Sequence, residues 1–175
     1  IEQASLDGGV TSECTIVEGH DSDNDGILDG TELGVALADV TADTDLDIFV
    51  PDLDPGTTTN PLSKDTDADG LEDGEEDINF NGRRDSEETD PNLKDTDGDG
   101  MDDLFETTYG SASDCTQPLS PTDPDDGQVL DGGIELDNDG DGLSNFEEYG
   151  LLPFPSNPCS PDSDADGLVD EIEVN

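Results

Sequence analysis

Residues 65–88 read DTDADGLEDGEEDINFNGRRDSEE, and in this stretch one acidic phrase of twelve residues is followed directly by a second of the same design. Both phrases fit the pattern D-x-[DN]-x-[DN]-G-x5-E, in which oxygen-bearing side chains alternate before a glycine and a glutamate closes the phrase. Glu76 ends the first phrase and Asp77 begins the second. No helix can therefore lie between them.

The composition of the chain limits how such phrases can fold. The 175 residues contain 50 Asp and Glu against 4 Lys and Arg, a net charge of −46, and only 29% are apolar. This is too little apolar surface and too much like charge for an ordinary packed core. The chain should repel nucleic acid and attract cations. Either it is disordered, which composition alone favours, or bound metal neutralises its carboxylates and supplies folding energy.

The same pattern is complete six times, and these phrases are named loops 1 to 6. They span residues 21–32, 65–76, 77–88, 95–106, 137–148 and 162–173. Six matches, each with glycine at position 6 and glutamate at position 12, are not expected by chance. A degenerate seventh stretch, residues 122–133, keeps Asp126 and Gly127 but lacks the closing glutamate, and we predict no ion there.

The spacing suits a calcium loop of the EF-hand type. Side chains at positions 1, 3, 5, 9 and 12 and the backbone carbonyl at position 7 would surround one cation, and the glycine at position 6 permits the sharp turn. All of these ligands are hard oxygens, which favours calcium over zinc, copper or iron, and the roomy seven-oxygen shell makes magnesium a weaker rival. We predict about six Ca²⁺ sites. Their ligands are Asp21, Asp23, Asp25, Ile27, Asp29 and Glu32; Asp65, Asp67, Asp69, Leu71, Asp73 and Glu76; Asp77, Asn79, Asn81, Arg83, Asp85 and Glu88; Asp95, Asp97, Asp99, Met101, Asp103 and Glu106; Asp137, Asp139, Asp141, Leu143, Asn145 and Glu148; and Asp162, Asp164, Asp166, Leu168, Asp170 and Glu173.

Loop 3 should be the weakest of the six sites. Asn79 and Asn81 keep a carbonyl oxygen but carry no charge, and Arg83 and Arg84 add positive charge. Loop 5 carries one comparable change, Asn145 at position 9. A ligand tolerates such an exchange of carboxylate for amide, so these exceptions support the metal interpretation.

The surroundings of the loops exclude an EF-hand. Pro61, Pro91 and Pro158 each stand four residues before the first aspartate of a loop, where proline prevents a helix from running into it. We expect short helical turns within residues 31–40, 104–110 and 145–150. We expect brief strands at residues 14–18, 47–50 and within 128–136. The remainder reads as turns rich in Asp, Gly, Pro and Asn.

The phrases NPLSKDTDADGLEDGEE (60–76) and DPNLKDTDGDGMDD (90–103) resemble the thrombospondin type 3 repeats, particularly their bacterial versions. The resemblance covers most of residues 21–175. It implies an aperiodic chain wrapped around a row of calcium ions. The expected fold is therefore a mostly irregular, calcium-stabilised repeat array with short helical turns, a few short strands and little hydrophobic core. Residues 1–20 would form a separate N-terminal segment, available as a strand or an assembly contact.

The three cysteines, Cys14, Cys115 and Cys159, lie outside the loops and form no CxxC motif. In an extracellular calcium protein they indicate disulfide formation. We predict a bridge between Cys115 and Cys159, because both lie in proline-rich lead-ins of the C-terminal half. Cys14 would then be free, buried or bonded to another chain. The alternative is three buried free thiols.

The sequence does not favour an enzyme. The single histidine, His20, has no evident catalytic partner, and the chain has little apolar material with which to build a pocket that raises the pKa of a general acid. Open calcium loops of extracellular modules bind at about 10⁻⁴ to 10⁻³ M, a concentration found outside cells. These features favour an extracellular or cell-surface location.

The leading functional hypothesis is a calcium-binding structural protein, namely a rigid surface stalk, an adhesin segment or a filament subunit. Its partners would be calcium ions, further copies of the chain or other surface proteins, with no nucleic acid and no membrane insertion. Polymerisation is suggested by the odd cysteine and by the N-terminal segment. The alternatives are a calcium-dependent spacer or dockerin-like module of a secreted enzyme, and an acidic surface that nucleates mineral without a fixed fold.

Overall fold

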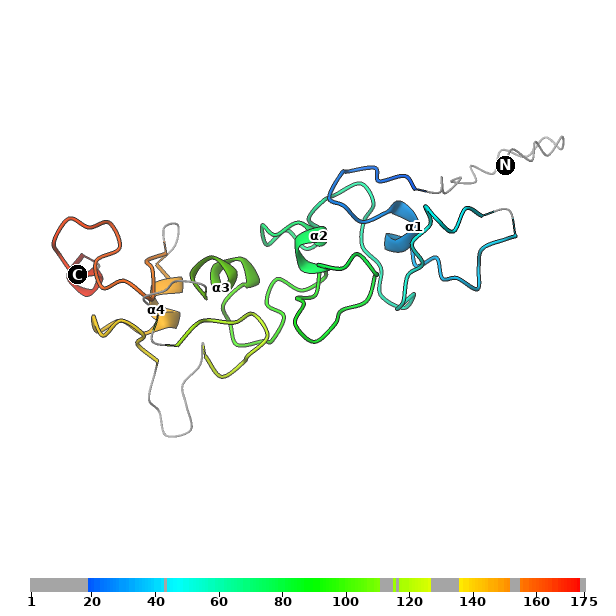
Figure 1. Ribbon diagram of the computed structural model, residues 1–175. Helices are drawn as coiled ribbons and strands as arrows, with labels where there is room; N and C mark the ends of the chain where they lie inside the picture. The colour runs from blue at the N-terminus through cyan, green and yellow to red at the C-terminus, as the bar shows by residue number, and fades with distance from the viewer. Residues whose placement is uncertain are drawn as a thin grey trace.

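The computed structural model describes residues 19–42, 44–110, 115, 117–126, 136–151 and 155–173. In these ranges the chain is mostly irregular, with five short helices and no strand. The helices are α1 (Asp29–Glu32), α2 (Asp73–Glu76), α3 (Asp103–Gly110), α4 (Asn145–Tyr149) and α5 (Asp170–Glu173). Figure 1 shows α1 to α4 following one another along an elongated molecule. The expected irregular chain with short helical turns is confirmed.

Every one of these helices begins at position 9 of a loop, and in α1, α2 and α5 the closing glutamate is the last residue. The helical turns expected within 104–110 and 145–150 correspond to α3 and α4. The turn expected over 31–40 is wrong, because α1 ends at Glu32. The Gly34 amide donates to the Thr31 carbonyl (3.0 Å) and Gly34 adopts a φ of +78°, a left-handed conformation that terminates a helix.

The strand expected at residues 47–50 is also wrong. The backbone amides of Ile48 and Phe49 both donate to the Asp45 carbonyl, at 3.1 and 2.9 Å, so the segment is a turn. The apolar run that suggested a strand buries Phe49 and leaves Ile48 52% exposed. The strands expected at 14–18 and within 128–136 lie outside the described residues, apart from Leu136.

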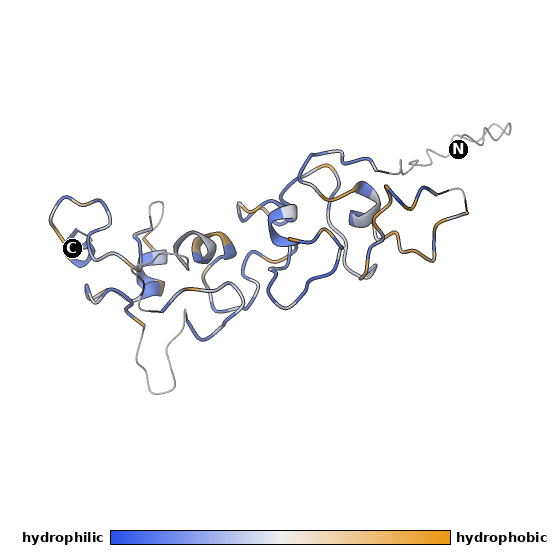
Figure 2. Ribbon diagram, in the orientation of Figure 1, coloured by the Kyte–Doolittle hydropathy of each residue, from blue (hydrophilic) through white to orange (hydrophobic). Residues whose placement is uncertain are grey.

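None of the helices in the described part of the chain has both the length and the apolar character needed to cross a bilayer. Figure 2 shows that apolar residues occur in short pieces scattered along the ribbon. One hydrophobic cluster is formed by Met101, Phe105 and Leu119, with Tyr109 and Tyr149 packed against it. The Phe105 ring meets those of Tyr109 and Tyr149 edge to face, at centroid distances of 4.8 and 5.1 Å. The described part of the protein therefore has a small hydrophobic core, to which loop 4 contributes Met101 and Phe105.

Each proline lead-in forms a tight turn that anchors the loop after it. In the first, the Ser63 amide donates to the Asn60 carbonyl (2.8 Å), with Pro61 at the second place of the turn, which proline favours. The Asn60 amide then donates to the Thr66 hydroxyl at position 2 of loop 2 (2.9 Å). The turns at 90–93 and 157–160 repeat both bonds. The prolines thus fix the approach to loops 2, 4 and 6.

Successive loops stack through the glycine at position 6. A Cβ added to Gly70 in loop 2 would lie 2.7 Å from the Leu104 side chain, and one added to Gly100 in loop 4 would lie 2.9 Å from the Phe146 ring. Leu104 and Phe146 hold position 10 of the next loop in the stack. At the end of the stack, Gly142 of loop 5 meets Glu171 of loop 6 in the same way. A residue without a side chain leaves room for these side chains to pack against the loop backbone.

Loop 3 branches away from this stack. Its Phe80 ring lies against Gly26 of loop 1, where a Cβ would be 2.9 Å away. Its own Gly82 packs on the Asp52 side chain, which comes from the connection between loops 1 and 2, and the Leu53 amide donates to the Asn81 carbonyl (2.8 Å). Loop 2 packs on loop 1 through Gly74, which lies against the Asp25 backbone. The order of stacking is therefore loop 1, 2, 4, 5 and 6, with loop 3 as a side branch.

Candidate metal centres

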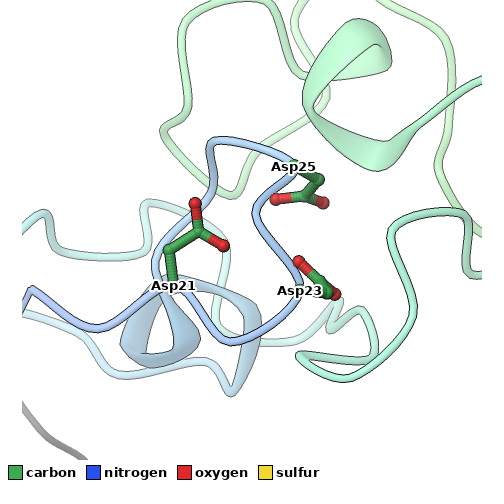
Figure 3. A group of neighbouring side chains, drawn as sticks. All are labelled: Asp21, Asp23 and Asp25. Carbon is green, nitrogen blue, oxygen red and sulfur yellow. The ribbon is translucent and has the colours of Figure 1, made fainter.

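The aspartates at positions 1, 3 and 5 of loop 1 point into one turn, as Figure 3 shows for Asp21, Asp23 and Asp25. Oxygens of these three residues lie within 4.8 Å of one another. The backbone explains the arrangement: Asn24 is left-handed (φ 64°), and the amides of Asn24 and Gly26 both donate to the Asp21 carboxylate, at 2.7 and 3.2 Å. Loops 2 and 4 form the same trio of aspartates.

A second cluster shares the aspartate at position 5 and joins two loops. In the first example Asp25 and the closing Glu32 of loop 1 meet Asp73, the first residue of α2 in loop 2, within 4.8 Å. Further along the stack, the charge of Asp103 in loop 4 raises the pKa of Glu76 in loop 2. The charge of Asp170 in loop 6 likewise raises the pKa of Glu148 in loop 5, so both aspartates lie near the closing glutamate of the preceding loop. Each cluster is thus completed by an aspartate that follows the loop.

The position 9 residue is held by its own loop while it serves the loop before it. Both the amide and the hydroxyl of Thr66 donate to the Asp73 carboxylate, at 2.7 and 2.6 Å. Thr96 makes the same pair of bonds to Asp103, and Ser163 to Asp170. The structure therefore places the expected position 9 ligands of loops 2, 4 and 6 at junctions between loops.

The junctions contain buried carboxylate oxygens that accept no hydrogen bond. Leaving such an atom without a partner is costly, so it points to a missing ligand. Most of the affected side chains hold position 3, 5 or 12 of a loop, namely Asp23, Asp25, Glu32, Asp67, Asp69, Glu76, Asp97, Glu106, Asp139 and Glu148. Asp52 and Asp126, which lie outside the loops, each have one such oxygen as well. A group of converging anionic oxygens without donors fits a hard metal cation.

Hydroxyl groups orient the closing glutamates. Thr59 donates to the Glu32 carboxylate (3.1 Å) and Ser156 to that of Glu148 (3.0 Å). Each hydroxyl residue directly precedes the Asn-Pro of a lead-in turn. Thr89 stands at the corresponding place beside Glu76, short of hydrogen-bonding geometry. The lead-in turn of one loop thus positions a ligand of the loop before it.

The surroundings of the closing glutamates disfavour their charged form. Burial, with added repulsion from the aspartates at positions 3 and 5, raises their pKa far above the ordinary value of 4.5. The pKa is raised to about 8 for Glu32, about 9 for Glu76, about 10 for Glu106 and about 8 for Glu148. At neutral pH these groups would hold protons unless a cation took their place.

Loop 3 has a different arrangement. Its Asn79 amide donates to Asp85 (3.0 Å) and to Glu88 (2.7 Å), and the Asn81 amide also donates to Asp85 (3.0 Å). The amide groups of Asn81 and Asn79 and the Arg83 guanidinium hold the pKa of Asp85 below its usual value. These bonds would have to break before loop 3 could surround a cation, and they give a physical reason to expect its site to be the weakest.

Loop 6 has the same turn as the other loops, but no described loop follows it. The amides of Asp166 and Gly167 donate to Asp162, at 3.1 and 2.9 Å. Glu173 is exposed, and no described residue follows it to complete a junction. Loop 6 therefore supplies Asp170 to loop 5 but lacks such a partner of its own within the described ranges.

Asp126 is a candidate ligand that the sequence prediction missed. It lies within 4.8 Å of Asp99 and Glu106, and all three residues are buried. Loop 5 has Asn145 at position 9, and its amide donates to the Asp126 carbonyl (3.2 Å). Asp126 thus supplies a charge that Asn145 cannot. The signal in the sequence was the pairing of a neutral position 9 with an aspartate retained in the degenerate stretch 122–133.

Two further sequence predictions concern the ends of the array. His20 lies beside loop 1, with its Nδ1 atom 3.1 Å from the Asp29 carboxylate and 3.0 Å from the Ser22 hydroxyl. The predicted disulfide between Cys115 and Cys159 is confirmed. Cys14 lies outside the described residues, so its state stays a prediction.

Comparisons with protein-family models, with curated proteins and with solved structures found no match. The resemblance to thrombospondin type 3 repeats therefore rests on the loop phrases and the lead-in prolines.

Proposed function

We propose that the protein is an extracellular calcium-binding structural protein in which cations take the place of a hydrophobic core. The observation that carries the proposal is the set of buried carboxylate oxygens without hydrogen-bond donors at the junctions between stacked loops. An ion at each junction would neutralise repulsion that the apolar content of the chain cannot offset.

Calcium is the cation that these centres suit best. Their ligands are carboxylates and carbonyls from a flexible, roomy wrap, whereas magnesium requires a tight octahedron and retains its waters. Open loops of this kind bind at about 10⁻⁴ to 10⁻³ M, so the protein would be filled only outside the cell. This argument supports a surface or extracellular location, and calcium loops of this kind fit the proposed membership of the thrombospondin type 3 repeats.

The mechanical consequence is stiffness. Because each junction takes ligands from two loops, an ion bound there fixes the angle between them as well as the shape of each. A row of such junctions along the elongated molecule (Figure 1) would behave as a rod in calcium and as a repelling coil without it. A rigid stalk, an adhesin segment or a filament subunit requires this property. Residues 1–20 are proposed as the contact for assembly with further copies or other surface proteins.

The test combines calorimetric titration with small-angle X-ray scattering, first in EDTA and then in millimolar calcium. We expect several calcium ions to bind per chain and the scattering to change from an expanded coil to a narrow rod. Magnesium at the same concentration serves as the control and should produce a smaller change. A chain that binds no calcium, or that stays an expanded coil when loaded, would refute the proposal.

A further inference from the structure

We infer that the disulfide between Cys115 and Cys159 governs one metal centre, the Asp99–Glu106–Asp126 centre, by positioning Asp126 against loop 4. The inference rests on the proposed calcium-binding function. It assigns an ion to a centre that Asp126 completes, and it predicts that this centre alone responds to reduction.

The centre is a built site within the fold. Glu106 is completely buried and neither of its carboxylate oxygens accepts a hydrogen bond. Asp126 is 7% exposed, and its Oδ1 atom also lacks a donor, while its Oδ2 atom accepts from the Ser120 amide (2.7 Å). With Asp99, these side chains bring ligand atoms within 4.8 Å of one another. A divalent, oxygen-preferring cation would satisfy all three carboxylates.

Asp126 is fixed differently from the aspartates that complete the other junctions. Asp73, Asp103 and Asp170 each begin a helix and each accept two bonds from position 2 of their own loop. Asp126 belongs to no such loop.

The segment 117–126 contacts other described residues at Gln117, Leu119 and Asp126, and the Leu119 backbone lies against Gly110. The Asn138 amide donates to the Gln117 carbonyl (2.7 Å), the Asn145 amide donates to the Asp126 carbonyl (3.2 Å), and Leu119 packs in the small core. The covalent bond from Cys115 stands two residues before this segment begins. Loss of the disulfide would release the Gln117 end of this segment, and we expect the displacement to reach Asp126 at its other end.

The turn that contains Cys159 should keep its structure without the disulfide. Cys159 lies in the lead-in turn 157–160, which repeats the hydrogen bonds of the turns at 60–63 and 90–93. Those two turns contain no cysteine. The turn at 157–160, and with it the approach to loop 6, should therefore survive reduction. Reduction should act on the Asp126 side and leave the Asp25–Glu32–Asp73 cluster intact.

The experiment uses the full chain carrying Cys14→Ser, so that one cysteine pair remains. A water-soluble phosphine in EDTA reduces the bridge: the phosphine takes the oxygen of one water and becomes a phosphine oxide, and the two water protons end on the two thiols. Excess reagent is removed, and calcium binding to the oxidised and reduced proteins is measured by native mass spectrometry and calorimetry. We expect reduction to weaken one site at least tenfold.

Two variants locate the affected site. Asp126→Asn should lose that site in the oxidised protein, and reduction should then cause no further loss. Asp170→Asn is the matched control, because it removes the equivalent ligand from the loop 5 junction. It should lose one site when oxidised and a second when reduced. Circular dichroism and scattering in calcium check that both variants keep the rod.

The outcomes separate this inference from the function on which it rests. If the oxidised protein binds no calcium, the proposed function fails and the inference falls with it. If it binds calcium and reduction changes nothing, the disulfide has no part in the centre and only the inference fails. Loss of most sites on reduction would show that the bridge supports the whole array, which also overturns the inference. Loss of one site that Asp126→Asn abolishes would establish it.

Discussion

Two positions within each loop adopt left-handed backbone, and they tolerate side chains differently. Position 4 has φ near +60°, and Asn24, Ala68 and Ala165 occupy it. Position 6 reaches +107° at Gly100, beyond the left-handed region that side chains enter at modest cost. The glycine is therefore required at position 6 of loops 1, 2, 4, 5 and 6, where φ is +99° to +114°, and it is optional at position 4. Gly82 of loop 3 has a φ of +72°.

Replacing Gly100 by alanine should destabilise the calcium-loaded protein strongly. The new Cβ would lie 2.9 Å from the Phe146 ring, on backbone that strains any side chain. Gly98→Ala is the matched control, because its Cβ would meet nothing within 4 Å and alanine already holds position 4 in loops 2 and 6. We expect Gly100→Ala to cost at least about 1 kcal/mol more in unfolding free energy. Equal losses in urea denaturation would contradict this account.

At the scale of the element, the unit of construction is a lead-in turn, a loop and a short helix that begins at position 9. In the units of loops 2 and 6, the residue before the lead-in turn supplies a hydroxyl to the closing glutamate of the preceding loop, and the helix supplies an aspartate to the same junction. Two elements of one unit thus complete the site of its predecessor. This arrangement explains why the helices can be one turn long, since their task is to place a single carboxylate.

The hydroxyl of Thr59 provides a test of this unit. Thr59→Val removes the donor to Glu32 while keeping the shape of the side chain. We expect a loss of about 0.5–1.5 kcal/mol in the stability of the calcium-loaded protein, the usual worth of one hydrogen bond, and weaker calcium binding at loop 1. Thr58→Val is the control, because Thr58 is exposed and adjacent. A larger effect from Thr58→Val in thermal unfolding would argue against the role of Thr59.

For the whole molecule, the raised pKa values predict opposite effects of pH with and without calcium. In the metal-free folded state the closing glutamates bind protons up to pKa values of about 8 to 10, whereas in the unfolded chain they lose them near 4.5. Between these limits the folded state holds more protons, so its stability is greatest below pH 4.5 and falls as pH rises. With calcium the proton must leave before the ion binds, so affinity should rise with pH.

The measurement is circular dichroism at pH 5 and pH 8, once in EDTA and once in millimolar calcium, which reports how much of the chain is folded; chemical unfolding is added wherever a folded state is present. We expect the EDTA sample to be more stable at pH 5 and the calcium sample to be more stable at pH 8. Glu87→Gln, at an exposed position of loop 3, should leave both trends unchanged. An EDTA sample that gains stability toward pH 8 would show that the buried glutamates do not govern folding.

Much of the local structure follows from the sequence, because it depends on bonds that span few residues. The converging aspartates at positions 1, 3 and 5, the turn at glycine and the proline lead-ins form from contacts within one phrase. The same reasoning failed at 31–40 and 47–50, where apolar residues suggested a helical turn and a strand. It succeeded with Cys115 and Cys159, whose shared lead-in context hinted at proximity.

By itself, the sequence determined that the chain would wrap in repeated acidic turns with oxygen ligands, since the spacing of Asp, Gly and Glu fixes each turn locally. Only the tertiary structure decided which loops adjoin. It sets loop 3 aside, brings Asp73 to Glu32, and substitutes Asp126 for the neutral Asn145. These pairings depend on how one turn packs on the glycine of another, and no spacing within a single phrase records that contact.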